Sequence, residues 1–212
     1  MIETDVTKEK CYIIAEIVNR MKDIYNKSNI KQKAFIETII GASLWYLPKP
    51  IDHWSGFISV GLIRSFSKNK NTKKSQEHII PRKISAKELF QMNISLSAEF
   101  VKEKYLSRYC KIHYLTQEEN IKARNFQKEE NYVNSDEVYK KSGIELIEIN
   151  NNILRKVEEG DMEVINKILE LYKKGENIIK YFEMELNSKQ ISTKKNYILP
   201  DETKRKINKL RN

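Results

Sequence analysis

Apolar side chains recur at helical spacing over most of this chain. Residues 5–27 place cysteine, isoleucine, valine and methionine three or four positions apart, and residues 30–47 continue in the same way. Prolines at positions 48 and 50 end the second segment, because proline lacks a backbone N–H and disfavours the helical conformation of the residue before it. The pattern predicts two helices whose apolar faces contribute to the hydrophobic core.

Shorter elements are predicted next. Residues 51–60 are expected to form a compact connection, within which Ser59 caps the start of a short helix. The polar, lysine-rich residues 67–75 predict a loop. Residues 77–80 predict the end of a strand, because a proline follows them directly.

The centre of the chain alternates helix and strand patterns. Two helices are predicted near residues 85–92 and 95–108. Residues 110–115 alternate polar and apolar side chains of β-favouring types, which indicates a strand. Thr116 is expected to cap the next helix, with Glu119 three residues on completing a capping box.

The last third of the chain predicts mostly helix. A polar loop over residues 128–137 precedes a short helix and a strand at residues 144–149. Residues 150–187 have a helical period that is interrupted near Gly160, and the tail, residues 188–212, is rich in lysine and arginine.

Composition supports a helical protein with its own core. Hydrophobic residues make up 40% of the 212, which is enough to exclude wholesale disorder. The chain has only 6 glycines and 4 prolines, fewer than the turns of an all-β sandwich or barrel require. Helix is therefore expected to dominate.

The charge balance favours a polyanionic partner. The chain carries 39 Lys and Arg against 29 Asp and Glu, a formal charge of +10 and a pI near 9.3. Such an excess is typical of nucleic-acid binding, and the alternative is that the lysine-rich and asparagine-rich composition reflects the composition of the genome. Apolar runs stay shorter than the ~18 residues of a membrane span, the N-terminus is acidic, and the two cysteines, Cys11 and Cys110, cannot build a disulfide framework. We expect a cytoplasmic protein without a membrane partner.

The segment with the most chemical information is residues 76–83, with the sequence QEHIIPRK. It places Glu77 beside His78 at the end of a predicted strand. Adjacent strand residues point to opposite faces, so these two side chains are expected to diverge unless the strand bends or ends there. An acid beside a histidine is common on strands, and the pair alone does not define a site.

A second segment, residues 115–120 with the sequence LTQEEN, leads from a predicted strand into the capped helix that presents Asn120. Together the two segments resemble the HNH, or ββα-metal, endonucleases. That family has Asp/Glu-His-Ile/Val-x-Pro on a first strand, then a second strand, then Leu-Thr-x-(Glu/Asp)-Glu-Asn before a basic helix. The resemblance covers about residues 75–127 and implies a mainly α protein with a small embedded ββα-metal (HNH-like) unit, an α+β fold class.

The helical pattern and the resemblance together predict three regions. Residues 1–50 would form an N-terminal helical region, and residues 51–130 an HNH-like nuclease core with a helical insertion at residues 85–108. Residues 131–212 would form a mostly helical C-terminal region with a basic tail.

The sequence departs from the family pattern in three ways. The inserted helices lengthen the separation of His78 from Asn120. The middle Asn that orients the catalytic histidine in the family has no clear equivalent; Lys111 falls near its place and Asn93 lies in the insertion. No CxxC pair is present, so the structural zinc of some members is not expected.

The resemblance implies a metal-dependent endonuclease that hydrolyses DNA phosphodiester bonds. His78, neutral at physiological pH, would take a proton from the attacking water. Glu77 and Asn120 offer hard oxygen ligands for one Mg²⁺ or Mn²⁺ per site, which would bind the scissile phosphate and stabilise the leaving oxygen.

Basic side chains flank both segments and are expected to bind phosphates without reading base sequence. The expected phosphate-binding residues are Arg82, Lys83, Lys122, Arg124, Lys73 and Lys74. For the lysines of residues 67–75, a solvated loop is the alternative.

Several alternatives stay open. The chain could be a non-catalytic nucleic-acid-binding protein on a degenerate HNH scaffold that lost its activity with the middle Asn. Duplex DNA is the expected partner, and RNA is not excluded. A homodimer would suit a duplex cutter, because each single-site unit cuts one strand. A restriction or phage-defence role fits by analogy with the family alone.

Overall fold

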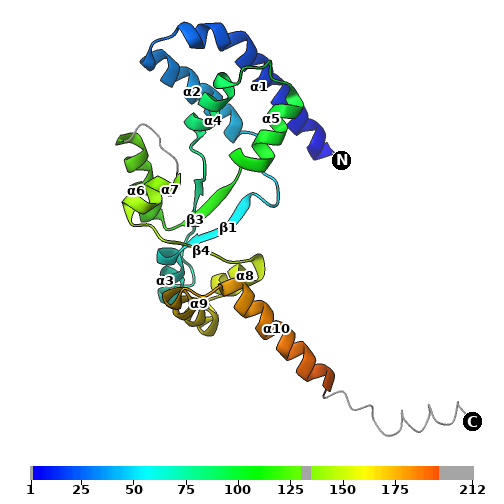
Figure 1. The fold of residues 1–212 in the computed structure, drawn as a ribbon, viewed down its shortest axis with the longest axis vertical. Coiled ribbons are helices and arrows are strands. Elements are labelled where there is room, and N and C mark those ends of the chain that lie inside the picture. Colours follow the sequence, from blue (N-terminus) through cyan, green and yellow to red (C-terminus); the bar gives the residue numbers. More distant parts are fainter. Residues whose placement is uncertain (1, 130–134, 196–212) are drawn as a thin grey trace, which may run out of the picture. The chain divides into compact units, whose positions relative to one another are not determined.

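The computed structural model describes residues 2–129 and 135–195. The chain divides into two compact units, residues 1–166 and residues 167–212, and Figure 1 gives the order of the helices and strands. The first unit contains the whole sheet and all the site residues expected from the sequence.

Two long helices open the first unit. α1 (Ile2–Lys27) and α2 (Ile30–Trp45) confirm the helices that the apolar period predicts. Asn29 caps α2 in a capping box with Gln32, in which each side chain accepts a hydrogen bond of 3.0 Å from the backbone N–H of the other residue.

The helical insertion packs against these two helices. α4 (Arg82–Gln91) lies on α2, α5 (Ala98–Lys104) lies on α1, and the π-helix η1 (Tyr105–Tyr109) continues α5. The inserted segment therefore completes the core of the N-terminal helices. Its fully buried members include Cys11, Ile40, Ala86, Leu89, Phe90 and Val101.

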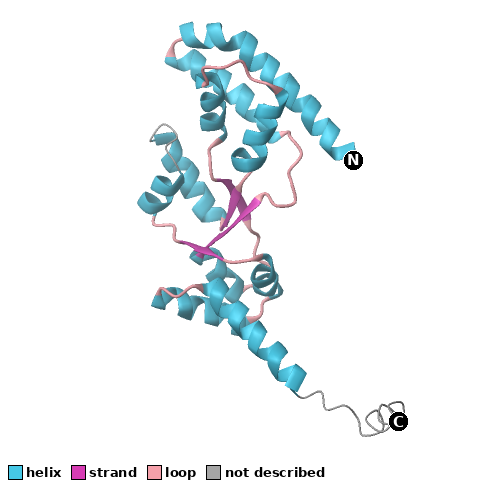
Figure 2. Ribbon diagram, turned by 45° about the vertical axis from the view of Figure 1, so that its right-hand side comes forward, coloured by secondary structure: helices cyan, strands magenta, loops and turns pink. Residues whose placement is uncertain are grey.

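Four short strands, magenta in Figure 2, form one mixed sheet. Their order in the sheet is β2-β3-β1-β4. The strands are β1 (Trp54–Ser59), β2 (Ser75–His78), β3 (Ile112–Leu115) and β4 (Leu146–Glu148). β3 pairs antiparallel with β2 and parallel with β1, and β4 runs antiparallel to β1. β2 is therefore an edge strand, with Glu77 opposite His113 in the register.

The prediction of a compact connection over residues 51–60 is wrong, because β1 lies inside the sheet between β3 and β4. Gly56 has a φ of 90°, and the register of β1 against β3 shifts between Trp54 and Ile58. Such an irregularity breaks the strict alternation of side chains, so this segment carries no two-residue period in the sequence.

Helix α6 (Gln117–Glu129) follows β3 directly and packs on β2. Its predicted capping box is confirmed. The Thr116 N–H donates to Glu119 Oε2 at 2.9 Å, and the Glu119 N–H donates to Thr116 Oγ1 at 3.1 Å. β2, β3 and α6 thus form a strand–strand–helix unit in which Asn120, on the first turn of α6, lies beside β2.

Shorter helices complete the first unit. α3 (Val60–Lys68) packs on β1, α7 (Ser135–Ser142) on α6 and α8 (Asn151–Glu159) on α3. As predicted, Ser59 caps α3, and Gly160 ends α8 with a φ of 79°.

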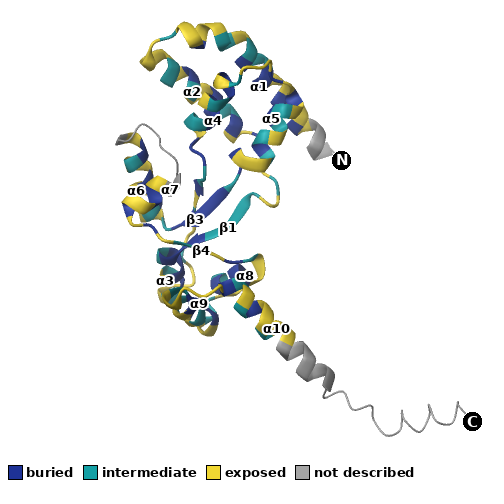
Figure 3. Cartoon of the chain, in the orientation of Figure 1, coloured by how far each residue is buried: buried dark blue, intermediate teal, exposed yellow. Residues whose placement is uncertain are grey.

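The architecture confirms a mainly helical chain with a small mixed sheet. α9 (Met162–Lys174) crosses the boundary of the two units, and α10 (Ile178–Lys195) belongs to the second. Figure 3 shows buried residues following β3 and the helix faces that meet the core. No helix among the described residues has the length and apolar character to cross a membrane. Residues 196–212 of the expected basic tail lie outside the described ones.

Candidate active site

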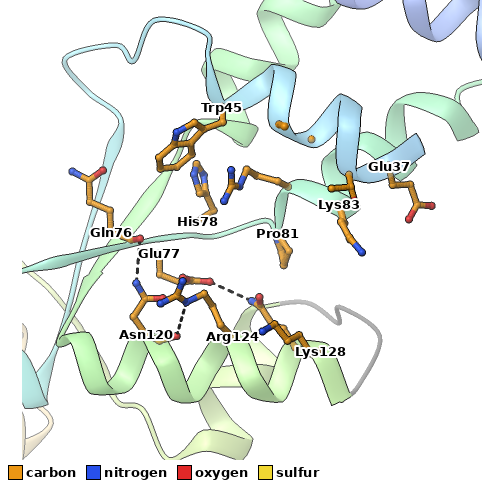
Figure 4. A pocket seen from close by; sticks show the side chains of 15 residues that line it. Glu37, Trp45, Gln76, Glu77, His78, Pro81, Lys83, Asn120, Arg124 and Lys128 are labelled. Atoms are coloured by element: carbon orange, nitrogen blue, oxygen red, sulfur yellow. Dashed lines mark hydrogen bonds between the residues drawn. The ribbon is translucent and has the colours of Figure 1, made fainter. Parts of the chain in front are cut away.

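A cavity of about 510 Å³ surrounds the end of β2 (Figure 4). Four elements of the first unit line it: α2, β2, the start of α4 and α6. The two sequence segments that carry the family resemblance therefore reach the same cavity. Among its lining residues are Trp45, Glu77, His78, Arg82, Asn120 and Arg124.

Glu77 and His78 lie on opposite sides of β2, as the alternation of a strand predicts (Figure 4). Glu77 faces α6, where the Gln127 side-chain amide donates to its Oε1 at 3.4 Å. His78 faces α2, and its ring lies edge-on to Trp45 with 5.0 Å between the centroids. β2 ends at His78, so the two side chains lie on opposite faces of the sheet at the end of this edge strand.

Burial controls the protonation of Glu77, which is only 7% exposed. Removal from water disfavours the carboxylate and raises the pKa of Glu77 to about 7. The positive charges of Arg124 and Arg82 and the hydrogen bond from Gln127 act in the opposite direction but are smaller. The carboxyl is therefore near the midpoint of its titration at neutral pH.

Burial acts on His78 in the opposite sense, because it disfavours the charged imidazolium. Burial, the largest cause, and the positive charge of Arg82 together lower the pKa of His78 to about 4. His78 Nδ1 lies 3.3 Å from the carbonyl oxygen of Tyr109. A carbonyl can only accept, so Nδ1 carries the proton and Nε2 keeps its lone pair. Nε2 is buried and has no hydrogen-bond partner.

The Tyr109 carbonyl thus orients the ring of His78. The sequence contains no clear match to the middle Asn of the HNH pattern, and a backbone carbonyl just before β3 stands at His78 instead. Its position depends on the three-dimensional course of η1, which leaves no signal in residue types.

Asn120 is almost fully buried, with 5% exposure. Its Nδ2 donates to Ser75 Oγ and, at 3.5 Å, to the carbonyl oxygen of Gln76. These bonds hold the amide against β2 and leave its Oδ1 buried without a partner. An unpartnered buried oxygen is costly unless something else satisfies it.

The carboxyl of Glu77 and the Oδ1 of Asn120 fit a hard divalent cation such as Mg²⁺ or Mn²⁺. Both are oxygen donors at one cavity, and Mg²⁺ characteristically retains several waters beside one or two protein ligands. Within the part of the chain that the structure describes, no group of three or more His, Cys, Asp or Glu gathers as a metal cluster. Any metal here would depend on one carboxylate, one amide and water.

The structure brings only part of the expected phosphate-binding set to the cavity. Arg82, Lys83 and Arg124 line it. Lys122 instead donates to the carbonyl of Ser142, and neither Lys73 nor Lys74 is among the lining residues.

Lys74 is engaged within its own chain. Its Nζ pairs with Glu158 at 2.5 Å and lies 4.2 Å from the ring centroid of Tyr114. One lysine of the lysine-rich loop therefore forms an ion pair with α8. The sequence did not indicate this pairing.

Several lining residues were not singled out by the sequence, among them Trp45, Gln127 and Lys128. Trp45 ends α2, whose apolar spacing is typical of a helix that contributes to the core. Gln127 and Lys128 lie on α6 and belong to no recognisable motif. The other histidines stay away from the cavity: His53 Nδ1 lies 2.8 Å from the Pro50 carbonyl, and His113 is buried between aromatic rings.

No protein-family model matches the chain, and neither a curated protein nor a solved structure matches it significantly. The chemistry of the cavity is thus the observation that bears on function.

Proposed function

We propose that this protein is a metal-dependent endonuclease of HNH type that hydrolyses DNA phosphodiester bonds. One observation carries the proposal. Glu77 and His78 on β2 line a single cavity with Asn120 on α6, which is far from them in the sequence, and with several cations. A strand–strand–helix unit with an acid, a histidine and an amide at one edge supports an HNH-like site.

His78 is the general base in this proposal. Its lowered pKa keeps the imidazole neutral at pH 7, and the Tyr109 carbonyl directs the lone pair to Nε2. Nε2 can then accept the proton of a water that attacks phosphorus. Because the pKa of His78 is about 4, its proton affinity is modest, and the attacking water must be acidified by its surroundings for the transfer to proceed.

Glu77 and Asn120 would hold the divalent cation, Mg²⁺ or Mn²⁺. When bound, the ion supplies charge neutralisation at the phosphate and stabilises the leaving oxygen. Asn120 is held for this role by Ser75 and Gln76, and Glu77 by Gln127. Deprotonation of Glu77 is required, so metal affinity increases as the pH rises through about 7.

Cationic side chains at the cavity would hold the substrate. Arg124 donates its Nε–H to the Asn120 carbonyl at 3.4 Å and so presents its guanidinium beside the ligand pair. Arg82 and Lys83, at the start of α4, line the same cavity, and the charge of Arg82 acts on His78. Phosphate contacts of this kind position a strand without specifying sequence.

The second candidate is a non-catalytic nucleic-acid-binding protein on the same scaffold. The burial of Nε2 of His78 and the engagement of Glu77 by Gln127 favour it, because both groups are partly withheld from a substrate. Duplex DNA remains the proposed partner, with RNA as a further substrate to be tested, and homodimerisation and a restriction or phage-defence role belong to the same proposal.

A plasmid-nicking assay with Mg²⁺ or Mn²⁺ separates the two candidates. Wild type is expected to convert supercoiled DNA to open circles only when the metal is present, and His78→Ala is expected to lose this activity. Absence of nicking by wild type, or equal nicking by His78→Ala, would overturn the enzyme proposal. Salt-dependent retention of DNA by both proteins without nicking would support the binding protein instead.

A further inference from the structure

A cluster of cations surrounds the indole of Trp45 on the His78 side of β2. Lys49 Nζ lies 4.2 Å and Arg82 Cζ lies 4.6 Å from the centroid of the Trp45 ring. The His78 ring meets the same indole edge-on. Two cations and one neutral imidazole therefore share one aromatic side chain, and Trp45 itself is 36% exposed.

The charge of Arg82 acts on the buried Glu77 carboxyl, but neither cation has a salt-bridge partner among the described residues. Within that part of the chain, Lys49 donates only to the neutral Gln76 amide, at 2.9 Å. Glu37 lines the same cavity but accepts a hydrogen bond of 2.7 Å from the Tyr25 hydroxyl.

The positive charges of Lys49 and Arg82 repel each other. The pKa of Lys49 is lowered, first by burial and then by the charge of Arg82. Two like charges held together cost free energy that a bound anion would offset. Cation–π contact with the indole holds both groups in place while their N–H donors remain available.

The backbone around Lys49 and Arg82 restricts where their side chains can lie. Lys49 lies between Pro48 and Pro50, which restrict the conformation of the segment and reduce the entropy lost when the side chain binds. Arg82 is brought close by Gly41, one helical turn before Trp45. A Cβ at Gly41 would lie 2.8 Å from the Arg82 carbonyl oxygen, so only glycine permits this approach of α4 to α2.

We infer that Lys49 and Arg82, held on the indole of Trp45, form a second phosphate site that binds a nucleic-acid strand on the side of β2 opposite Glu77 and Asn120. The inference rests on the proposed function for its ligand. It adds Lys49 and Trp45, from the N-terminal helical region, to the substrate-binding surface. The nucleic-acid strand would then be bound on both sides of the edge of β2, with His78 between the two phosphate-binding sites.

Tryptophan fluorescence tests this site without metal or cleavage. Trp54→Phe leaves Trp45 as the only indole, because the chain has two tryptophans. With EDTA present, duplex DNA is expected to change the emission of Trp45. Lys49→Gln is expected to weaken binding and to reduce the slope of log affinity against log salt by about 1, the value of one lost phosphate contact. Lys49→Arg is expected to restore both.

Lys33→Gln is the matched control, because Lys33 also lies over an aromatic ring, 5.2 Å from the centroid of Tyr25, but does not line the cavity. Its salt slope is expected to equal that of the parent. Unchanged Trp45 emission on DNA binding, or an unchanged slope in Lys49→Gln, would overturn the inference.

Inorganic phosphate forms the second arm of the test. It is expected to change the emission only at far higher concentration than duplex DNA, and equal affinities would contradict a site for a nucleic-acid strand. Because no metal is present, this experiment can succeed when plasmid nicking fails, and it can fail when nicking succeeds.

Discussion

Glu77 and His78 are neighbours in the chain, and burial drives both towards their neutral forms. An acid is charged when deprotonated and a histidine when protonated, so loss of water raises the pKa of Glu77 to about 7 and lowers that of His78 to about 4. Between these values both side chains are uncharged. The arginines and lysines of the cavity then dominate its electrostatic field, which suits an anionic ligand.

The raised pKa of Glu77 predicts a loss of stability at high pH. The neutral acid is favoured in the fold, so its contribution is complete below the unfolded value of 4.5 and is lost as the pH rises through about 7. Glu77→Gln removes this titration while keeping the shape. Between pH 4.5 and 8, wild type is expected to lose on the order of 3 kcal/mol of unfolding free energy more than the variant. Urea unfolding at both pH values measures it, and parallel pH profiles would contradict the prediction.

At the scale of elements, α6 is fixed by a hydrogen-bonded network at its first turn. Glu119 Oε2 accepts from the Ser59 hydroxyl at 2.5 Å and from the Thr116 N–H, so one carboxylate joins β1, the end of β3 and α6. Gly61 on α3 makes room for it. A Cβ there would lie 2.3 Å from Glu119 Oε1. The position of Asn120, the next residue, depends on this network.

Gly61→Ala should therefore destabilise the protein. Replacing glycine by alanine inside an unobstructed helix normally stabilises it by about 1 kcal/mol. Here the new methyl group displaces Glu119, and we expect a loss of about 1–3 kcal/mol instead. The sign should reverse in a Glu119→Ala background, where the obstruction is gone. Thermal or urea unfolding of the four proteins of this cycle measures the coupling, and additive effects would contradict the proposed contact.

Local signals explain which elements could be predicted from the sequence. The helical period identifies α1 and α2, and the Thr116–Glu119 box places Asn120 on the first turn of α6, because both depend on nearby residues. β1 has an irregular register near Gly56, so the sequence does not predict it. For the site as well, only the features that depend on nearby residues could be predicted.

Contacts between distant segments could not be predicted in this way. The Tyr109 carbonyl at His78 is a backbone group, and the approach of Lys49 and Arg82 to Trp45 joins two parts of the chain through tertiary packing. The sequence predicts the chemical types at β2 and α6, and the fold determines which cations accompany them.

At the scale of the whole molecule, the formal charge of +10 includes cations that, among the described residues, have different surroundings. Lys74 pairs with Glu158, and Lys122 donates to the carbonyl of Ser142, whereas Arg82 and Arg124 line the cavity. Under the proposed function, the second kind of cation would hold the substrate at β2. The net charge is therefore a poor guide to which residues bind.

Two cations on α6 provide a matched comparison of this point. Arg124 and Lys122 are two residues apart, but only Arg124 lines the cavity. Arg124→Gln is expected to reduce the salt slope of DNA binding by about 1, and Lys122→Gln to leave it unchanged. Fluorescence anisotropy with a labelled duplex at several salt concentrations measures both. Equal effects of the two substitutions would indicate that the charge acts without reference to the cavity.

The central claim is that the cavity at β2 cleaves phosphodiester bonds with a metal held by Glu77 and Asn120. Its most direct test is the single-turnover cleavage rate of a labelled DNA duplex, measured over a range of Mn²⁺ concentrations. We predict cleavage by wild type and by Lys122→Gln at equal rates, and a rate at least about 100-fold lower for Glu77→Gln. Cleavage by Glu77→Gln at the wild-type rate, or no cleavage by wild type at any Mn²⁺ concentration, would contradict the claim.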